Sequence, residues 1–147
     1  AMRLVTLMAA ALCVAQFAAC ETPPADSGSV YITNESFEDL PAPKDALYQT
    51  AKDESYAYRG KGFRWGQFVY LYDAELEQAV DFYKTVPTQP PYSWALGGVS
   101  YRDSLKTAIL EMNKNEDRCR IEIRRISPDK AETTRLRIVV RLNDPKK

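Results

Sequence analysis

Two stretches near the end of the chain alternate apolar and charged side chains in the pattern of β-strands. In residues 118–126, RCRIEIRRI, and residues 133–143, TTRLRIVVRLN, apolar side chains recur at every second position. Successive side chains of a strand point to opposite faces, so each stretch buries one face and exposes the other. The sequence therefore predicts an antiparallel sheet with one solvated face.

The preceding residues complete the predicted domain. Residues 54–73, ESYAYRGKGFRWGQFVYLYD, indicate two aromatic strands joined at Gly60-Lys61-Gly62, and the second is apolar on both faces, as an interior strand is. Asp73 is the expected N-cap of a helix over 74–86, and two more strands are expected in 92–102 and 104–113. We expect an α+β fold, in which one helix packs on a twisted, mainly antiparallel sheet in the order β-β-α-β-β-β-β.

Composition removes several classes of function. The 147 residues include 20 basic and 20 acidic side chains, so no net field would recruit nucleic acid. Histidine, the usual general base and a common metal ligand, is absent. Cys119 is the one cysteine of the body and is expected to be a buried, inert thiol. No motif for phosphate binding or a nucleophile is present, so we expect a non-enzymatic protein without a metal or cofactor.

The N-terminal segment has the layout of a secretory signal peptide. Residues 2–20 read MRLVTLMAAALCVAQFAAC, with Arg3 in front, an apolar run after it, and two small residues before Cys20. The uncharged run from Leu4 to Ala19 is 16 residues long, shorter than the about 20 that span a bilayer as a helix.

The four residues Phe17-Ala18-Ala19-Cys20 resemble a bacterial lipobox, with an apolar residue and two small ones before a cysteine. The resemblance implies that the Cys20 thiol takes a diacylglyceryl group, that the peptide is cut before Cys20, and that the freed amine is acylated, for example with palmitate. Two or three such chains hold a protein firmly on a bilayer. An unlipidated secreted protein or a retained anchor is the alternative.

The lipobox resemblance also implies a subcellular location and a domain layout. Glu21, in place of Asp after Cys20, favours the outer membrane of the cell envelope, facing the periplasm, over the inner membrane. We expect a signal peptide at 1–19, the lipidated Cys20 and a flexible acidic, Pro-rich tether at 20–47, and a globular domain at 48–147. The body, with a DFYK helix and a Cys-x-Ile-x-Ile strand, loosely resembles small uncharacterised bacterial lipoproteins, a likeness that implies no activity.

Charge is segregated along the mature chain. Residues 21–54 carry eight acids against two lysines, whereas residues 118–147 carry ten bases against four acids. By strand parity, six arginines share the outward face of the last two strands: Arg118, Arg120, Arg124, Arg135, Arg137 and Arg141. The acidic N-terminal segment could lie across this face, or the face could meet an anionic lipid surface or an envelope protein. A merely solvated outer face is the third interpretation.

Aromatic side chains suggest a different function. Trp65, Tyr70, Tyr83 and Trp94 could line a cleft between helix and sheet that binds a small hydrophobic or glycan ligand. They could equally be core residues, since aromatic side chains dominate protein cores. We expect the chain to be an envelope lipoprotein that acts as an interaction or adaptor module through its arginines, with the ligand-binding cleft as the alternative.

Overall fold

The computed structural model describes residues Val30–Tyr31 and 37–144 of the chain. Their elements are β1 (Val30–Tyr31), β2 (Leu47–Tyr48), β3 (Tyr56–Gly60), β4 (Phe63–Asp73), α1 (Leu76–Thr85), β5 (Ala95–Arg102), β6 (Thr107–Lys114), β7 (Asp117–Arg125) and β8 (Arg135–Leu142). An antiparallel sheet with a single helix in the described part of the chain makes the fold α+β, as predicted. Two short strands, β1 and β2, precede the seven elements that the sequence suggested.

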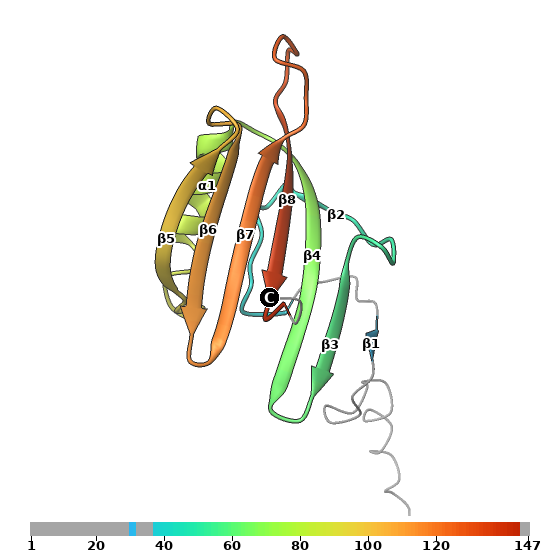
Figure 1. Cartoon of the computed structure of the whole chain (residues 1–147), viewed down its shortest axis with the longest axis vertical. Coiled ribbons are helices and arrows are strands. Elements are labelled where there is room, and N and C mark those ends of the chain that lie inside the picture. Colours follow the sequence, from blue (N-terminus) through green and yellow to red (C-terminus); the bar gives the residue numbers. More distant parts are fainter. Residues whose placement is uncertain (1–29, 32–36, 145–147) are drawn as a thin grey trace, which may run out of the picture.

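All the strands of residues 30–31 and 37–144 belong to one sheet, in the order β1-β3-β4-β8-β7-β6-β5, and β2 pairs with β4 beyond the end of β3. Each neighbouring pair is antiparallel, and Figure 1 shows the long strands running side by side with α1 on one face. β4 lies between β3 and β8, which confirms the prediction of an interior strand. The last of the described strands, β8, is therefore central in the sheet.

The alternating pattern of β7 and β8 decides which face of the sheet is buried. Ile121 on β7 lies opposite Val140 on β8, and both point into the core, together with Leu110 on β6. Ala79, Val80 and Tyr83 of α1 cover this inner face. Burying such a side chain contributes about 1.5–3 kcal/mol to folding, so the apolar positions of the strands stabilise the packing of the helix on the sheet.

The predicted start of the helix is wrong by two residues. Glu75 is the N-cap, and it forms a capping box with Gln78, whose side chain accepts a hydrogen bond from the Glu75 backbone N–H at 3.0 Å. Asp73 instead accepts from the Arg135 guanidinium, its cross-strand neighbour, at 2.8 Å. The ion pair across β4 and β8 thus keeps Asp73 in the strand.

Residues 37–48, here called the N-terminal strap, also pack on the inner face. Phe37 and Leu40 are buried, and the Phe37 ring meets the edge of the Phe68 ring at a centroid distance of 5.4 Å. Tyr48 continues this contact, with its ring 5.3 Å from that of Tyr70. The strap covers the part of the sheet that α1 leaves open, so residues 37–47, which the sequence placed in the tether, are part of the folded domain (Figure 1).

Candidate functional site

The six candidate arginines lie on the outer face of β7 and β8, opposite the core. We call them the arginine face; they are Arg118, Arg120, Arg124, Arg135, Arg137 and Arg141. The strand register sets Arg120 directly opposite Arg141, and Arg124 directly opposite Arg137. Like charges in direct cross-strand positions repel, so this arrangement requires compensating negative charge.

Three of the arginines find that compensation within the domain. Arg135 pairs with Asp73 at 2.8 Å, and this contact lowers the pKa of the Asp73 carboxyl. Arg137 pairs with Glu54 at 2.6 Å. Arg141 lies 4.0 Å from Glu122 and donates to the side-chain oxygen of Gln67 at 3.0 Å.

The other three arginines make no ion pair with any residue in the described part of the chain: Arg118, Arg120 and Arg124. Arg118 and Arg124 are exposed, so water solvates their charge. Arg120 is half-buried, and its Nε–H is buried without an acceptor in the described structure. A buried donor without a partner costs about 1–3 kcal/mol, which an incoming acceptor would recover.

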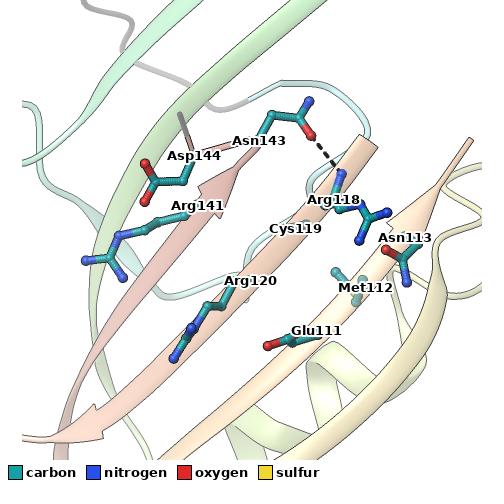
Figure 2. Close-up of a pocket in the computed structure, with 9 residues that line it drawn as sticks. All are labelled: Glu111, Met112, Asn113, Arg118, Cys119, Arg120, Arg141, Asn143 and Asp144. Atoms are coloured by element: carbon teal, nitrogen blue, oxygen red, sulfur yellow. Dashed lines mark hydrogen bonds between the residues drawn. The ribbon is translucent and has the colours of Figure 1, made fainter. Parts of the chain in front are cut away.

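A groove of about 400 Å³ opens on the arginine face beside Arg120. Its charged lining is Arg118, Arg120 and Arg141, with Glu111 on β6 and Asp144 after β8. Figure 2 shows these side chains around the groove, with the Asn143 side chain accepting a hydrogen bond from the Arg118 backbone N–H at 2.8 Å. Arginines outnumber acids, so the groove suits a carboxylate or phosphate group.

The four aromatic residues expected to line a cleft do not meet in one. Tyr70, Tyr83 and Trp94 are core residues, of which Trp94 is only 2% exposed. Trp65 points to the outer face, because it has the opposite parity to Tyr70 on β4, and its ring stacks on that of Tyr58 at 5.5 Å. Three of the four side chains are thus buried in the core and the fourth lies on the other face of the sheet, so the aromatic-cleft interpretation is corrected: they do not form one binding site.

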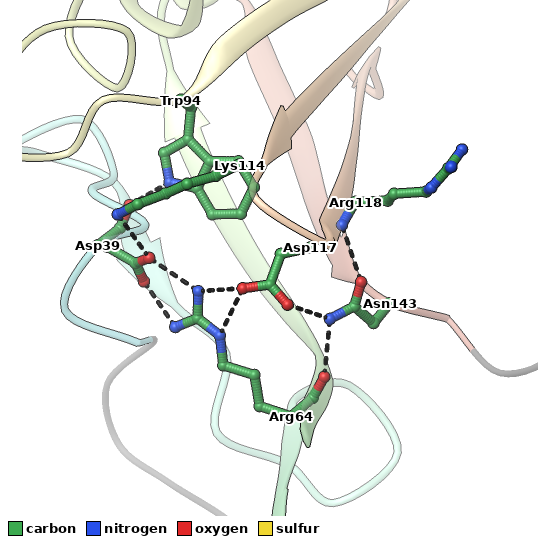
Figure 3. Close-up of polar contacts among 7 residues, drawn as sticks. All are labelled: Asp39, Arg64, Trp94, Lys114, Asp117, Arg118 and Asn143. Carbon is green, nitrogen blue, oxygen red and sulfur yellow. Dashed lines mark hydrogen bonds and ion pairs between the residues drawn. The ribbon is translucent and has the colours of Figure 1, made fainter. Parts of the chain in front are cut away.

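Sequence reasoning missed an ion network that fastens the strap, drawn in Figure 3. Arg64 at the start of β4 donates to both oxygens of Asp39 at 2.8 Å and to Asp117 at 2.8 Å. Lys114 also reaches Asp39, at 3.1 Å, and Trp94 Nε1 donates to the Asp39 carbonyl at 2.6 Å. Asp39 therefore binds Arg64 and Lys114 rather than the arginine face, and among the acids of residues 37–54 it is Glu54 that pairs with that face.

Other chemistry-bearing groups of the described residues are inert or scattered. Cys119 is buried and free, as expected, and burial raises the pKa of its thiol to about 12. Within residues 37–144, no group of three or more His, Cys, Asp or Glu side chains is placed to hold a metal ion. No helix in the described part of the chain has the length and apolar character to cross a bilayer. The predicted lipidation site, Cys20, lies outside the described residues.

Comparison with family models and with curated proteins found no match.

Proposed function

We propose that the chain is a lipid-anchored, non-enzymatic interaction module of the bacterial cell envelope, held through an acylated Cys20. Its folding unit is the β-β-α-β-β-β-β body with the strap. In this proposal the groove of the arginine face docks an acidic segment of an envelope protein. The sequence supports the anchor through the lipobox-like Phe17-Ala18-Ala19-Cys20, and Glu21 favours the outer membrane facing the periplasm.

The observation that carries the docking proposal is the state of Arg120. In the strand register it lies between Glu111 of β6 and Arg141 of β8, its Nε–H is buried, and no residue in the described part of the chain accepts from that Nε–H. A carboxylate in the groove would accept a charge-assisted hydrogen bond from Arg120 and reduce its repulsion with Arg141. Such bonds are about twice as strong as hydrogen bonds between neutral groups, so a single acidic side chain of the partner would gain binding free energy at this position.

Site-specific photo-cross-linking in native envelopes tests the docking proposal. A photoreactive side chain at Glu111, on the exposed rim of the groove, should capture one discrete protein. The same group at Glu132, an exposed residue of the loop between β7 and β8, should not.

Matched charge reversals identify the groove as the cause. Arg120→Glu and Arg141→Glu should each lower the cross-link yield by about tenfold or more, because a carboxylate would then meet like charge. Arg102→Glu, at an exposed arginine of β5 outside the groove, is the control and should leave the yield unchanged. A cross-link to lipid alone, or a protein cross-link insensitive to Arg120→Glu, would refute the proposed docking site.

A further inference from the structure

The hairpin of β3 and β4 projects beyond the rest of the sheet. Pairing between β4 and β8 begins at Gly66, so Phe63, Arg64 and Trp65 pair with β3 alone among the described strands. Figure 1 shows the hairpin reaching past the ends of its neighbours, at the opposite end of the molecule from the turn between β5 and β6. The tip of this hairpin is Arg59–Phe63.

Aromatic rings line the outer face of the hairpin up to its tip. Trp65 stacks on Tyr58 at 5.5 Å, Tyr56 meets the Trp65 ring at 5.7 Å, and Phe63 lies 6.3 Å from Tyr58. The Phe63 side chain is 50% exposed, although it is one of the largest apolar groups of the hairpin. Aromatic side chains at this position suit the interface of a bilayer, where rings with an apolar body and a polar edge collect.

Two basic residues, Arg59 and Lys61, lie within four positions of Phe63 at the hairpin turn. Lys61 is exposed, and neither Lys61 nor Arg59 makes an ion pair with the described residues, whereas Asp39 and Asp117 neutralise Arg64. Arg59 lies over the Phe37 ring, 4.6 Å from its centroid. A hollow of about 320 Å³ is lined by Arg59, Gly60, Gly62, Phe63, Arg64 and Asp117. Arg64 and Asp117 pair with each other at 2.8 Å, so Arg59 is the cation of this lining that a lipid phosphate would meet.

The path of the chain brings this end of the molecule near the proposed anchor. Val30 of β1 pairs with Tyr58 of β3, close to the hairpin tip. Cys20 precedes Val30 by ten residues, which span at most about 35 Å when fully extended. Acyl chains on Cys20 would therefore hold the bilayer surface within reach of Phe63 and Lys61.

We propose that the hairpin tip, Arg59–Phe63, docks on the anionic surface of the bilayer that holds Cys20. The Phe63 ring enters the headgroup region, Trp65 follows at its edge, and Lys61 and Arg59 meet lipid phosphates. This inference rests on the proposed lipid anchor and adds the orientation: the sheet stands upright on the membrane, with the arginine face at its side.

Tryptophan fluorescence of the mature lipidated protein tests the orientation, because Trp65 and the buried Trp94 are the two tryptophans of the chain. The protein is reconstituted in vesicles of phosphatidylethanolamine and phosphatidylglycerol whose acyl chains carry bromine as a quencher. The wild type should be quenched, and Trp65→Phe, which leaves Trp94 alone, should not.

Variants at the two ends of the molecule provide matched controls. Lys61→Glu should lower the ratio of docked to undocked protein about fivefold or more. One basic side chain near an anionic membrane surface raises the binding equilibrium by about that factor. Phe63→Ser should abolish most of the quenching, whereas Leu105→Ser, at a 70% exposed leucine in the turn between β5 and β6, should not change it.

The outcomes separate the hairpin from the anchor. Vesicle-bound protein whose Trp65 is unquenched would refute the docked hairpin and leave the anchor intact. Equal quenching in purely zwitterionic vesicles would refute recognition of an anionic surface. If the protein purified from its host carries no acyl chain on Cys20 and does not bind the vesicles, the anchor is refuted and, with it, this inference.

Discussion

Asp39 is the residue through which the strap is fastened to the end of the sheet near the β3–β4 hairpin. Its two carboxylate oxygens accept from Arg64, and Lys114 and Trp94 approach from β6 and the loop before β5. Burial alone would raise the pKa of the Asp39 carboxyl, but the hydrogen bonds from Arg64 and Lys114 outweigh it and hold that pKa below 3.8. The ionised form is therefore the one that the fold selects.

Replacing Asp39 by Asn should lower the free energy of unfolding by about 2 kcal/mol at pH 7, because Arg64 and Lys114 lose their shared counter-charge in a half-buried site. A carboxyl whose pKa is lower in the folded state than in the unfolded state stabilises the folded state at pH values above its ordinary pKa. This contribution is lost as the pH falls through the pKa of the folded state. The difference between wild type and Asp39→Asn should therefore shrink below pH 3.8. Urea unfolding followed by tryptophan fluorescence measures it.

An exposed ion pair is the matched control for Asp39. Lys106 and Asp129 lie 3.2 Å apart with side chains 50% and 66% exposed, so Asp129→Asn should cost at most about 0.5 kcal/mol. An Asp39→Asn protein as stable as the Asp129→Asn protein at neutral pH would mean that the apolar contacts of the strap hold it without the ion network.

At the scale of elements, the close pairing of β3 with β4 depends on a glycine. A Cβ at Gly66 would lie 2.7 Å from the backbone oxygen of Tyr56, and backbone cannot move aside as a side chain can. Gly66→Ala should therefore destabilise the domain by about 1–3 kcal/mol, measured by thermal and urea unfolding. Gly98→Ala on β5 is the control, since a Cβ there meets nothing within 4 Å; equal stability losses would contradict the packing argument.

Local pattern was sufficient for the strands and the arginine face but not for the strap. Alternation places Arg120 and Arg137 opposite the core whatever the neighbours of their strands are. Phe37 and Leu40, by contrast, stand singly among acids and prolines, so no period marks them as buried. Asp39 and Arg64 are 25 positions apart in the chain, and their pairing follows only once β4 and the strap are in place.

The lining of the groove and the start of the helix were likewise not predictable from local sequence pattern. Glu111 joins Arg120 and Arg141 because β6 and β8 flank β7, a strand order that periodicity does not contain. Asp73 is a good N-cap by type, yet Arg135 competes for it across β4 and β8. Trp65 was grouped with Tyr70 by residue type, although five positions on one strand put the two on opposite faces.

At the scale of the whole molecule, the proposed anchor predicts a change of compartment. Cys20→Ser removes the sulfur that would carry the diacylglyceryl group, so the protein should leave the membrane fraction and appear in the soluble one. Fractionation with a high-salt wash, with the acyl chains of the wild type checked by mass spectrometry, measures this. Cys119→Ser should leave the distribution unchanged, because Cys119 is buried in the sheet. Salt-resistant attachment of Cys20→Ser would contradict the anchor.

The ion network around Arg64 also bears on how the domain resists force applied to its N-terminal side. The pairing of β1 with β3 covers two residues, so it offers little resistance. Tension arriving through the strap next meets Asp39, whose bonds to Arg64 and Lys114 connect it to β4 and β6. Force applied at that end is thus shared between two strands on either side of the central β8 and β7 before any long strand has to peel away.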